Sequence, residues 1–547
     1  MQNFHNLQFD NTAINQLPLD PITENYPRKV NACFSIVKPT PILNPKLVHW
    51  SPRALQLLDL NLNEIKKPDI ANYLSGNQLL PGSQPIAHCY CGHQFGQFAG
   101  QLGDGRAISL GEIINRKGER WEIQLKGSGK TPYSRQADGR AVLRSSIREF
   151  LCSEAMHHLG IPTTRAATLI TSDTPVERDV RYDGNTIIEK ATVVSRIAPT
   201  FIRFGSFQIA DPPDSLTGQS GPSFGNPEII RQLTNYVIRY HYPHIFKDHP
   251  SKEQRVVAFA EELMVKTAKM VALWQCCGFT HGVLNTDNMS IAGLTIDYGP
   301  FGFLDNYDPD FISNASDKEG RYKFKNQPAM CKWNLQKLFI SLGLAFPQIK
   351  SQLDIISENF CTEYHVNYMT KMRKKLGLFK ARADDYKLVQ SLLDTMQETH
   401  GDFTNIFRNL SQFSLSTLAV DNDPILPLIL KQTRNNTPYQ RQGELWIEWL
   451  KVYKARLEYD FSSQTDNFNE WQSRRLYMMN HNNPRYILRN YLAQQAIKQA
   501  ESGNYEEVKR LFHLLSDPYD QSGKYREYEY DKLPPQWTTK LTLTCSS

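Results

Sequence analysis

Residues 281–299 read HGVLNTDNMSIAGLTIDYG and are the most informative part of this sequence. Asn288 follows His281 by seven positions, and Asp297-Tyr298-Gly299 begins nine positions after that Asn. Between them, the mostly apolar run 291–296 predicts a short hairpin strand. An amide and a carboxylate supply hard oxygen ligands of the kind that magnesium accepts beside water and phosphates. The stretch therefore predicts a site for a metal and a nucleotide.

The same intervals occur in the catalytic loop of protein kinases, H-R-D-x-x-x-x-N followed by D-F-G. Val283 stands where that loop has its catalytic Asp, and valine cannot accept a proton. Asp287 carries a carboxylate that could act as the base instead, although an Asp that caps a turn is the ordinary alternative. His281 is expected to brace the loop. The sequence thus combines an intact metal site with altered chemistry.

Upstream residues follow the order of a kinase N-terminal lobe. The apolar runs 107–114 and 121–125 predict a β-hairpin, with a glycine-rich loop before it. Lys126 ends the second run, and Glu149 lies on the next predicted helix, which has an apolar stripe from Leu143 to Leu159. This order matches the ion pair between a strand Lys and a helix Glu that positions phosphates. Taken singly, an exposed Lys and an exposed Glu are the ordinary alternative.

Glycines and arginines supply further candidates for phosphate binding. Gly103 and Gly105 lie in the glycine-rich stretch, where backbone N–H groups can approach phosphate, although glycines also make turns between strands. Arg106 at the exit of that stretch could form charge-assisted bonds. Arg196 and Arg203 could clamp phosphate oxygens through their fixed forks of donors. Ion pairs between lobes are the alternative for these two arginines.

Composition narrows the class of protein. With 547 residues, the chain exceeds the size of a single hydrophobic core, so two or more lobes are expected. A net charge of +6, spread along the chain, argues against nucleic acid as a partner. Nine cysteines without zinc spacing indicate a reducing compartment. Because neither a leader nor an apolar run of about 20 residues is present, we expect a cytoplasmic protein that is not bound to a membrane. We also expect a monomer.

The predicted fold is α+β with two lobes. Residues 1–84 form an irregular extension that packs on the lobes and has one helical patch, 52–60. Residues 85–228 form a β-rich, nucleotide-binding lobe with strands near 166–171 and 187–197. A helical C-terminal lobe, 229–520, contains the catalytic loop and the metal site. Within it, the amphipathic segment 256–274 leads to the loop, and 388–396, 445–457 and 487–500 are further helices. A tail, 521–547, contains Cys545.

With these residues assembled, the sequence resembles the selenoprotein O family, a kinase-fold group of protein adenylyltransferases, or AMPylators. The likeness extends over most of the chain. It is carried by GHQFGQFAGQLGDGRA at 92–107, LKGSGKTPYSRQADGRAVLRSSIREFL at 125–151, RFGSF at 203–207, HGVLNTDNMSIAGLTIDYGPFGFLD at 281–305 and the C-terminal CSS. Such long strings are far more specific than any single glycine motif.

The resemblance implies a protein-kinase-like (pseudokinase) fold and a nucleotide held in reverse relative to kinases. It further implies transfer of AMP from ATP to Ser, Thr or Tyr hydroxyls of target proteins, with release of pyrophosphate. Carried onto this sequence, the family's ATP contacts fall on Gly103, Gly105, Arg106, Lys126, Asp138, Gly139, Arg196 and Arg203. The family's general base falls on Asp287, and its ligands for Mg²⁺ or Mn²⁺ fall on Asn288 and Asp297. Glu149 orients Lys126.

Two other functions fit the same motifs. One is a phosphotransferase that uses Asp287 as its base, and the other is a pseudokinase scaffold that binds ATP without turnover. The two predicted metal ligands argue against the scaffold, because a protein that binds ATP without turnover has no need of them. Many family members carry a Cys near 311–314 that is thought to form a regulatory disulfide with a Cys close to the C-terminus. This chain keeps Cys545 but has Ser313 in that segment, so the resemblance leaves the disulfide open, with Cys331 as the other candidate partner.

Overall fold

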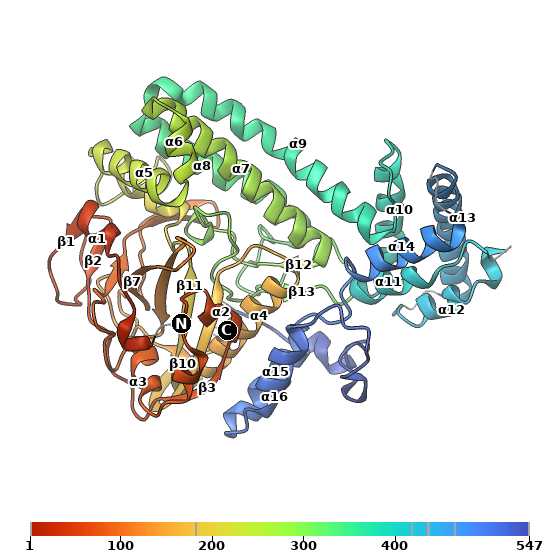
Figure 1. Ribbon diagram of the computed structural model, residues 1–547, viewed down its shortest axis with the longest axis horizontal. Helices are drawn as coiled ribbons and strands as arrows, with labels where there is room; N and C mark the ends of the chain where they lie inside the picture. The colour runs from red at the N-terminus through yellow and green to blue at the C-terminus, as the bar shows by residue number, and fades with distance from the viewer. Residues whose placement is uncertain (1–2, 181–182, 417–418, 435–437, 464–466, 545–547) are drawn as a thin grey trace.

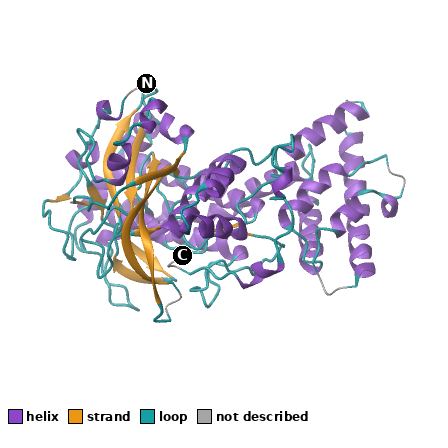
Figure 2. Ribbon diagram, turned by 90° about the horizontal axis from the view of Figure 1, so that it is seen from below, coloured by secondary structure: helices purple, strands orange, loops and turns teal. Residues whose placement is uncertain are grey.

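The computed structural model describes residues 3–180, 183–416, 419–434, 438–463 and 467–544. The chain folds into a β-sheet region and a larger helical region, which lie at opposite ends of the molecule in Figure 2. Helices and a mixed sheet confirm the predicted α+β class. In the described parts of the chain, every helix is too short or too polar to cross a bilayer.

A nine-stranded sheet dominates the first region, with the order β1-β2-β4-β7-β8-β11-β10-β3 and with β9 paired to β11. Only β1 and β2 are parallel among these pairs. The strands are β1 Leu19–Asp20, β2 Phe34–Ile36, β3 Lys46–Trp50, β4 Ile86–His88, β7 Ala107–Ile114, β8 Arg120–Lys126, β9 Ala141–Val142, β10 Arg165–Asp179 and β11 Thr186–Ala198. The predicted hairpin is confirmed as β7 and β8, which pair from Ala107 opposite Lys126 to Ile114 opposite Arg120.

Two expectations about the first hundred residues were wrong. The lead-in is not irregular throughout, because β2 pairs with β4, and β3 joins the sheet beside β10. The predicted helical patch 52–60 is confirmed by α2 (Pro52–Gln56), and α1 (Thr12–Gln16) and α3 (Ile70–Ser75) are further short helices of this segment. The glycine-rich stretch is not a plain loop, because β5 (Cys91–Gln94) and β6 (Gln97–Gln101) form a hairpin there. These strands of three to five residues are too short to show a clear alternating pattern.

Most helices follow the last strand of the sheet, whereas α4 lies between β9 and β10 in the chain. In Figure 1, α7 and α9 run side by side along one edge, α10 to α14 gather at the far end, and α15 and α16 lie near α4. The helices are α4 Leu143–His158, α5 Pro227–His241, α6 Pro243–Asp248, α7 Lys252–Cys277, α8 Gln327–Ala345, α9 Lys350–Lys375, α10 Asp385–Glu398, α11 Phe403–Asn409, α12 Ile425–Leu430, α13 Tyr439–Ser462, α14 Phe468–Asn480, α15 Asn490–Glu501 and α16 Glu506–Leu515. The predicted helical segments therefore all lie on helices or overlap them.

Helix α7 delivers the chain into the 281–299 stretch. It starts with a capping box between Ser251 and Gln254 and ends at Gly278, whose φ of 74° is the left-handed conformation that glycine adopts at helix ends. The short strands β12 (Phe279–Thr280) and β13 (Gly302–Phe303) then pair, so that the two ends of the 281–299 stretch lie side by side. The strand expected at 291–296 is absent from the stretch, where isolated bridges flank a turn instead. Ser290 bridges to Arg203, and Thr295 bridges to Thr163.

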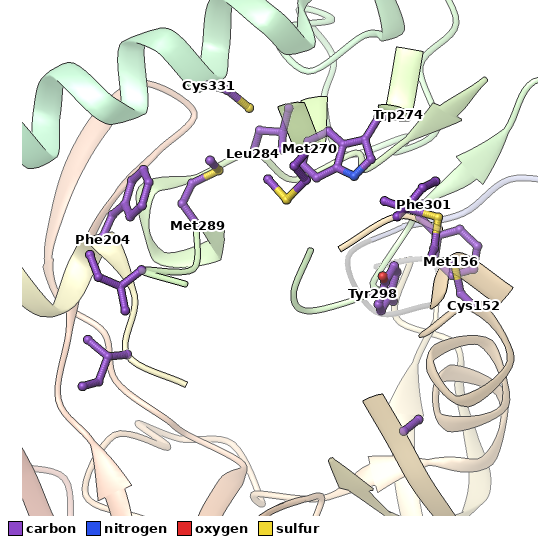
Figure 3. Close-up of a cluster of buried hydrophobic side chains, with 14 of the residues drawn as sticks. Cys152, Met156, Phe204, Met270, Trp274, Leu284, Met289, Tyr298, Phe301 and Cys331 are labelled. Atoms are coloured by element: carbon purple, nitrogen blue, oxygen red, sulfur yellow. The ribbon is translucent and has the colours of Figure 1, made fainter. Parts of the chain in front are cut away.

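Buried apolar side chains fix this stretch to α7. Figure 3 shows Leu284 and Met289 in the same cluster as Met270 and Trp274 of α7. Each of these four side chains is about 1% exposed or less. The indole Nε1 of Trp274 also donates to Thr295 Oγ1 at 2.9 Å. Since close-packed side chains resist displacement, the polar residues of the stretch are held by the core beneath them.

Candidate functional site

Asp297 is the centre of a buried charge cluster. Its φ of 59° is left-handed, a conformation that Asp tolerates better than most residues. Its carboxylate pairs with Arg196, with Arg203 and, at 3.4 Å, with Lys126 Nζ. Burial alone would raise the pKa of Asp297, but Arg203, Lys126 and Arg196 together hold it well below its usual range. The carboxylate is therefore ionised, with three cations around it.

The predicted ion pair between strand and helix is confirmed. Lys126 Nζ, at the end of β8, lies 2.8 Å from Glu149 Oε2 on α4. Arg196 Nη1, on β11, lies 2.9 Å from Glu149 Oε1. Glu149 is only 3% exposed, although it lies off the apolar stripe of its helix, because these two cations neutralise it. Burial lowers the pKa of Lys126 despite these partners.

Arg203 connects the cluster to the Asp287 turn. Its Nη1 donates to the backbone oxygen of Asp287 at 2.9 Å, and its Nη2 lies 3.3 Å from Asp104 Oδ1. Its guanidinium also lies 4.6 Å from the ring centroid of Tyr90. Asp104 accepts from Gln124 Nε2 at 3.1 Å as well. Both predicted arginines therefore form buried ion pairs with carboxylates.

Sequence reasoning missed the roles of Asp104, Gln124 and Tyr90 around these arginines. Two signals could have indicated them. The first signal is that Asp104 immediately precedes the Gly-Arg pair at 105–106. The second is that Gln124 lies two positions before Lys126 on β8, so the side chains of Gln124 and Lys126 point to the same face of the sheet. Tyr90 carries no comparable signal, because its contact with Arg203 joins residues that are far apart in the chain.

Asp287 has a different environment from Asp297. It lies in the single helical turn Thr286–Asn288 and is 7% exposed. Its Oδ2 accepts a long hydrogen bond from Gln94 Nε2 at 3.4 Å, and its Oδ1 has no hydrogen-bond partner among the described residues. Burial raises the pKa of Asp287 to about 6, against the opposing charge of Arg203. A carboxylate with such a pKa can both accept and hold a proton near neutral pH.

The hairpin β5–β6 fits closely against this carboxylate. A Cβ atom on Gly92 would lie 2.3 Å from Asp287 Oδ1. The backbone N–H of His93 donates to Thr286 Oγ1 at 2.8 Å, and that hydroxyl donates to Gln208 Oε1 at 2.6 Å. Gln208 Nε2 in turn lies 2.9 Å from His93 Nδ1. This closed ring of hydrogen bonds fixes the turn that carries Asp287.

His281 braces the loop, as predicted. Its Nε2 lies 2.9 Å from the backbone oxygen of Ile296, and its Nδ1 accepts from the backbone N–H of Val283 at 3.3 Å. Burial lowers the pKa of His281, so the ring is neutral and its Nε2 carries the proton. Both ring nitrogens of His281 are therefore hydrogen-bonded to backbone groups.

Asn288 and Asp297 carry the side-chain oxygens that the sequence predicts as ligands of a divalent cation. The Asn288 side-chain nitrogen donates to the backbone oxygen of Val283 at 3.0 Å, which leaves its carbonyl oxygen as the remaining ligand atom. Among the described residues, no group of three or more His, Cys, Asp or Glu side chains is gathered as in a dedicated metal site. A cation here would take its other ligands from water and phosphates, as magnesium commonly does.

The other predicted contacts lie around the cluster. Gly103 has a φ of 82° and packs so close to Tyr133 that a Cβ would lie 2.3 Å from its ring, and Gly105 meets the backbone of the same residue. Arg106 is exposed, and its positive charge contributes to lowering the pKa of Lys126.

Asp138 and Gly139 are held in a separate loop. Arg178 on β10 donates to both oxygens of Asp138, at 2.7 and 2.9 Å. Gly139 has a φ of 73°, and its backbone packs against that of Gly129. The structure therefore brings Lys126, Glu149, Arg196, Arg203 and Asp297 into direct contact, and leaves Asp138 in an ion pair of its own.

The C-terminal tail reaches the segment around Ser313. The backbone N–H of Ala315 donates to the oxygen of Leu543 at 2.8 Å. Ser313 is buried, and Cys331 is a buried free thiol. Cys545 lies outside the described residues.

Fold and site together define an α+β protein in which three buried cations surround one carboxylate, Asp297, while a second carboxylate, Asp287, lies in a desolvated environment of its own. A family model described as "Protein adenylyltransferase SelO" matches residues 21–516. The chain is 47% identical to "Protein adenylyltransferase SelO, mitochondrial" of Mus musculus, over 99% of this chain and 93% of the relative. It is 42% identical to "Protein nucleotidyltransferase YdiU" of Methylobacillus flagellatus, over 99% of this chain and 100% of the relative. The chain belongs to the SelO family.

Proposed function

We propose that this chain is a protein adenylyltransferase with a two-lobed, protein-kinase-like fold. It transfers AMP from ATP to Ser, Thr or Tyr hydroxyls of target proteins and releases pyrophosphate. One observation carries the proposal: three cations converge on Asp297, while the nearby carboxylate of Asp287 has an oxygen without a partner in the described structure. The names of the mouse and bacterial relatives support the reaction class.

The buried cations would hold the phosphates. Arg196 and Arg203 are each 2% exposed, so phosphates that reach them lie deep in the protein. A triphosphate that enters in this way presents its terminal phosphates to the interior and its α-phosphorus toward Asp287. This is the reverse of the orientation in kinases. Lys126, oriented by Glu149, completes the set, and Gly103, Gly105, Arg106, Asp138 and Gly139 would contact the rest of the nucleotide.

Asp287 is the general base in this mechanism. Its carboxylate accepts the proton of the acceptor hydroxyl as that oxygen forms a bond to the α-phosphorus. The bond between the α-phosphorus and the bridging oxygen breaks, and pyrophosphate leaves with the electron pair. Fixed cations such as Lys126 and Arg203 stabilise the charge that develops on the leaving group. Asn288 and Asp297 would hold Mg²⁺ or Mn²⁺, which when bound adds to this stabilisation.

Labelled ATP tests the proposal. Protein incubated with ATP labelled at the α-phosphate should transfer the label to an acceptor protein, and intact-mass analysis should show the gain of an adenylyl group. Label at the γ-phosphate should appear only in pyrophosphate. Transfer of the γ label to protein would identify a phosphotransferase instead, and binding of ATP with no transfer of either label would identify a scaffold.

A further inference from the structure

The tip of the β5–β6 hairpin carries an aromatic residue in a strained backbone conformation. Gln94 pairs with Gln97, so Phe95 and Gly96 form a two-residue turn. Their φ values are 50° and 90°. Turns with positive φ at both positions favour Asn-Gly, because a bulky side chain is strained in the left-handed region. Phe95 is therefore a poor residue for making this turn, and such outliers cluster at functional sites.

Three contacts hold Phe95 in place. Its backbone N–H donates to the Tyr322 hydroxyl at 2.8 Å and to Asn285 Oδ1 at 3.3 Å. The Tyr322 hydroxyl donates to the same Asn285 oxygen at 2.6 Å, and the rings of Phe95 and Tyr322 lie 5.3 Å apart. Even so, Phe95 is 42% exposed. The structure thus fixes the backbone of this residue and leaves much of its ring facing solvent.

The turn that carries this ring adjoins the carboxylate that we assign as the base, through the residue before Phe95. Gln94, the neighbour of Phe95 in the chain, donates to Asp287 Oδ2, and Asn285 lies two residues before Asp287. On the other side of the turn, the guanidinium of Arg321 would lie 3.1 Å from a Cβ on Gly96, and it stacks on Trp333 at 4.8 Å. An aromatic platform and a cation therefore adjoin the place where an acceptor hydroxyl must arrive.

We propose that Phe95, which is mounted on the buried Tyr322 and flanked by Arg321, forms the docking surface for the acceptor protein. The occupant is the segment of that protein that carries the acceptor hydroxyl, which packs on the Phe95 ring and so brings its hydroxyl to Asp287. This inference rests on the proposed function. A ring that is exposed and rigidly mounted gives contact area at little cost in conformational entropy, as aromatic anchors do in other interfaces.

The decisive variant is Phe95→Asn, because Asn removes the ring and suits the turn better than Phe. Dephosphorylated casein, a hydroxyl-rich and poorly structured protein, serves as the acceptor probe. We expect the KM for casein to rise about tenfold, with the affinity for an ATP analogue unchanged and the melting temperature unchanged or higher. Phe95→Trp, which keeps an aromatic platform, should retain the KM of the wild type.

Tyr439→Asn is the matched control, since Tyr439 is a 67% exposed aromatic at the start of α13. It should change none of these quantities. An unchanged KM for casein in Phe95→Asn would overturn the docking surface while leaving the proposed function intact. An equal loss of nucleotide affinity would also overturn it, because the ring would then serve the nucleotide. A wild-type protein that labels neither casein nor any protein of a soluble extract contradicts the proposed function, and this inference with it.

Discussion

Asp287 and Asp297 lie ten positions apart in one buried stretch, yet the protein gives them opposite environments. Asp297 is surrounded by Lys126, Arg196 and Arg203, which hold its pKa well below the usual range. Asp287 has a single long hydrogen bond from a side chain, and burial raises its pKa to about 6. Pairs of titratable groups with divergent pKa values commonly divide the roles at an active site.

The difference comes from the elements that reach each carboxylate. Asp297 faces the ends of strands β8 and β11, which deliver long cationic side chains. Asp287 faces the glycine hairpin β5–β6, where the absence of a side chain at Gly92 makes room for its oxygen. Positive charge around one carboxylate suits the binding of phosphates, whereas desolvation of the other suits proton transfer.

Removal of the Asp287 charge should give the largest effect on transfer. Asp287→Asn keeps the shape of the side chain but cannot accept the proton, so we expect kcat to fall by about 10²- to 10⁴-fold. Transfer of α-labelled AMP to casein measures this. Nucleotide affinity, measured by calorimetry with an ATP analogue, should hardly change. Full transfer in this variant would show that the two carboxylates do not divide the roles as proposed.

The matching change at Asp297 should act on folding as well as on activity. Asp297→Asn leaves Arg196 and Arg203 without their central counter-charge, and breaking a buried pair costs about 3–5 kcal/mol of unfolding free energy. Urea denaturation without nucleotide measures the loss. The control is Glu529→Gln, which breaks the exposed pair with Lys532 and should leave stability unchanged. Equal stability in both variants would mean that the cluster around Asp297 is not a buried network.

A methyl group at Gly92 tests the space around Asp287. Gly92→Ala puts a carbon within reach of Asp287 Oδ1 and should displace the carboxylate, and misplacement by about 1 Å can lower transfer roughly 100-fold. Nucleotide affinity should persist, because the cluster around Asp297 is not touched. Gly443→Ala, in α13 with open space around it, is the control. Loss of nucleotide affinity in Gly92→Ala would link the hairpin to the phosphates instead of to the base.

The sequence predicted those parts of this comparison that depend on local patterns. The helix α7, the β7–β8 hairpin and the Lys126–Glu149 pair follow from periodicity and from the order of motifs along the chain. The hairpin at 91–101 and the Gln208–Thr286 contact did not, because short strands carry little periodicity and the contact joins residues 78 positions apart. The domain boundaries at 84, 228 and 520 stay predictions.

The pH dependence of AMP transfer should report the titration of Asp287 and not that of Asp297. Protonated Asp287 cannot act as a base, so kcat/KM should rise about tenfold per pH unit up to about 6 and then level off. Asp297 stays ionised over that range because its pKa lies far lower, so nucleotide affinity should not follow the same curve. Gln94→Leu removes a hydrogen bond that lowers the pKa of Asp287, and its profile should therefore move to higher pH. A profile that stays in place in Gln94→Leu, or one that persists in Asp287→Asn, would assign the titration to another group.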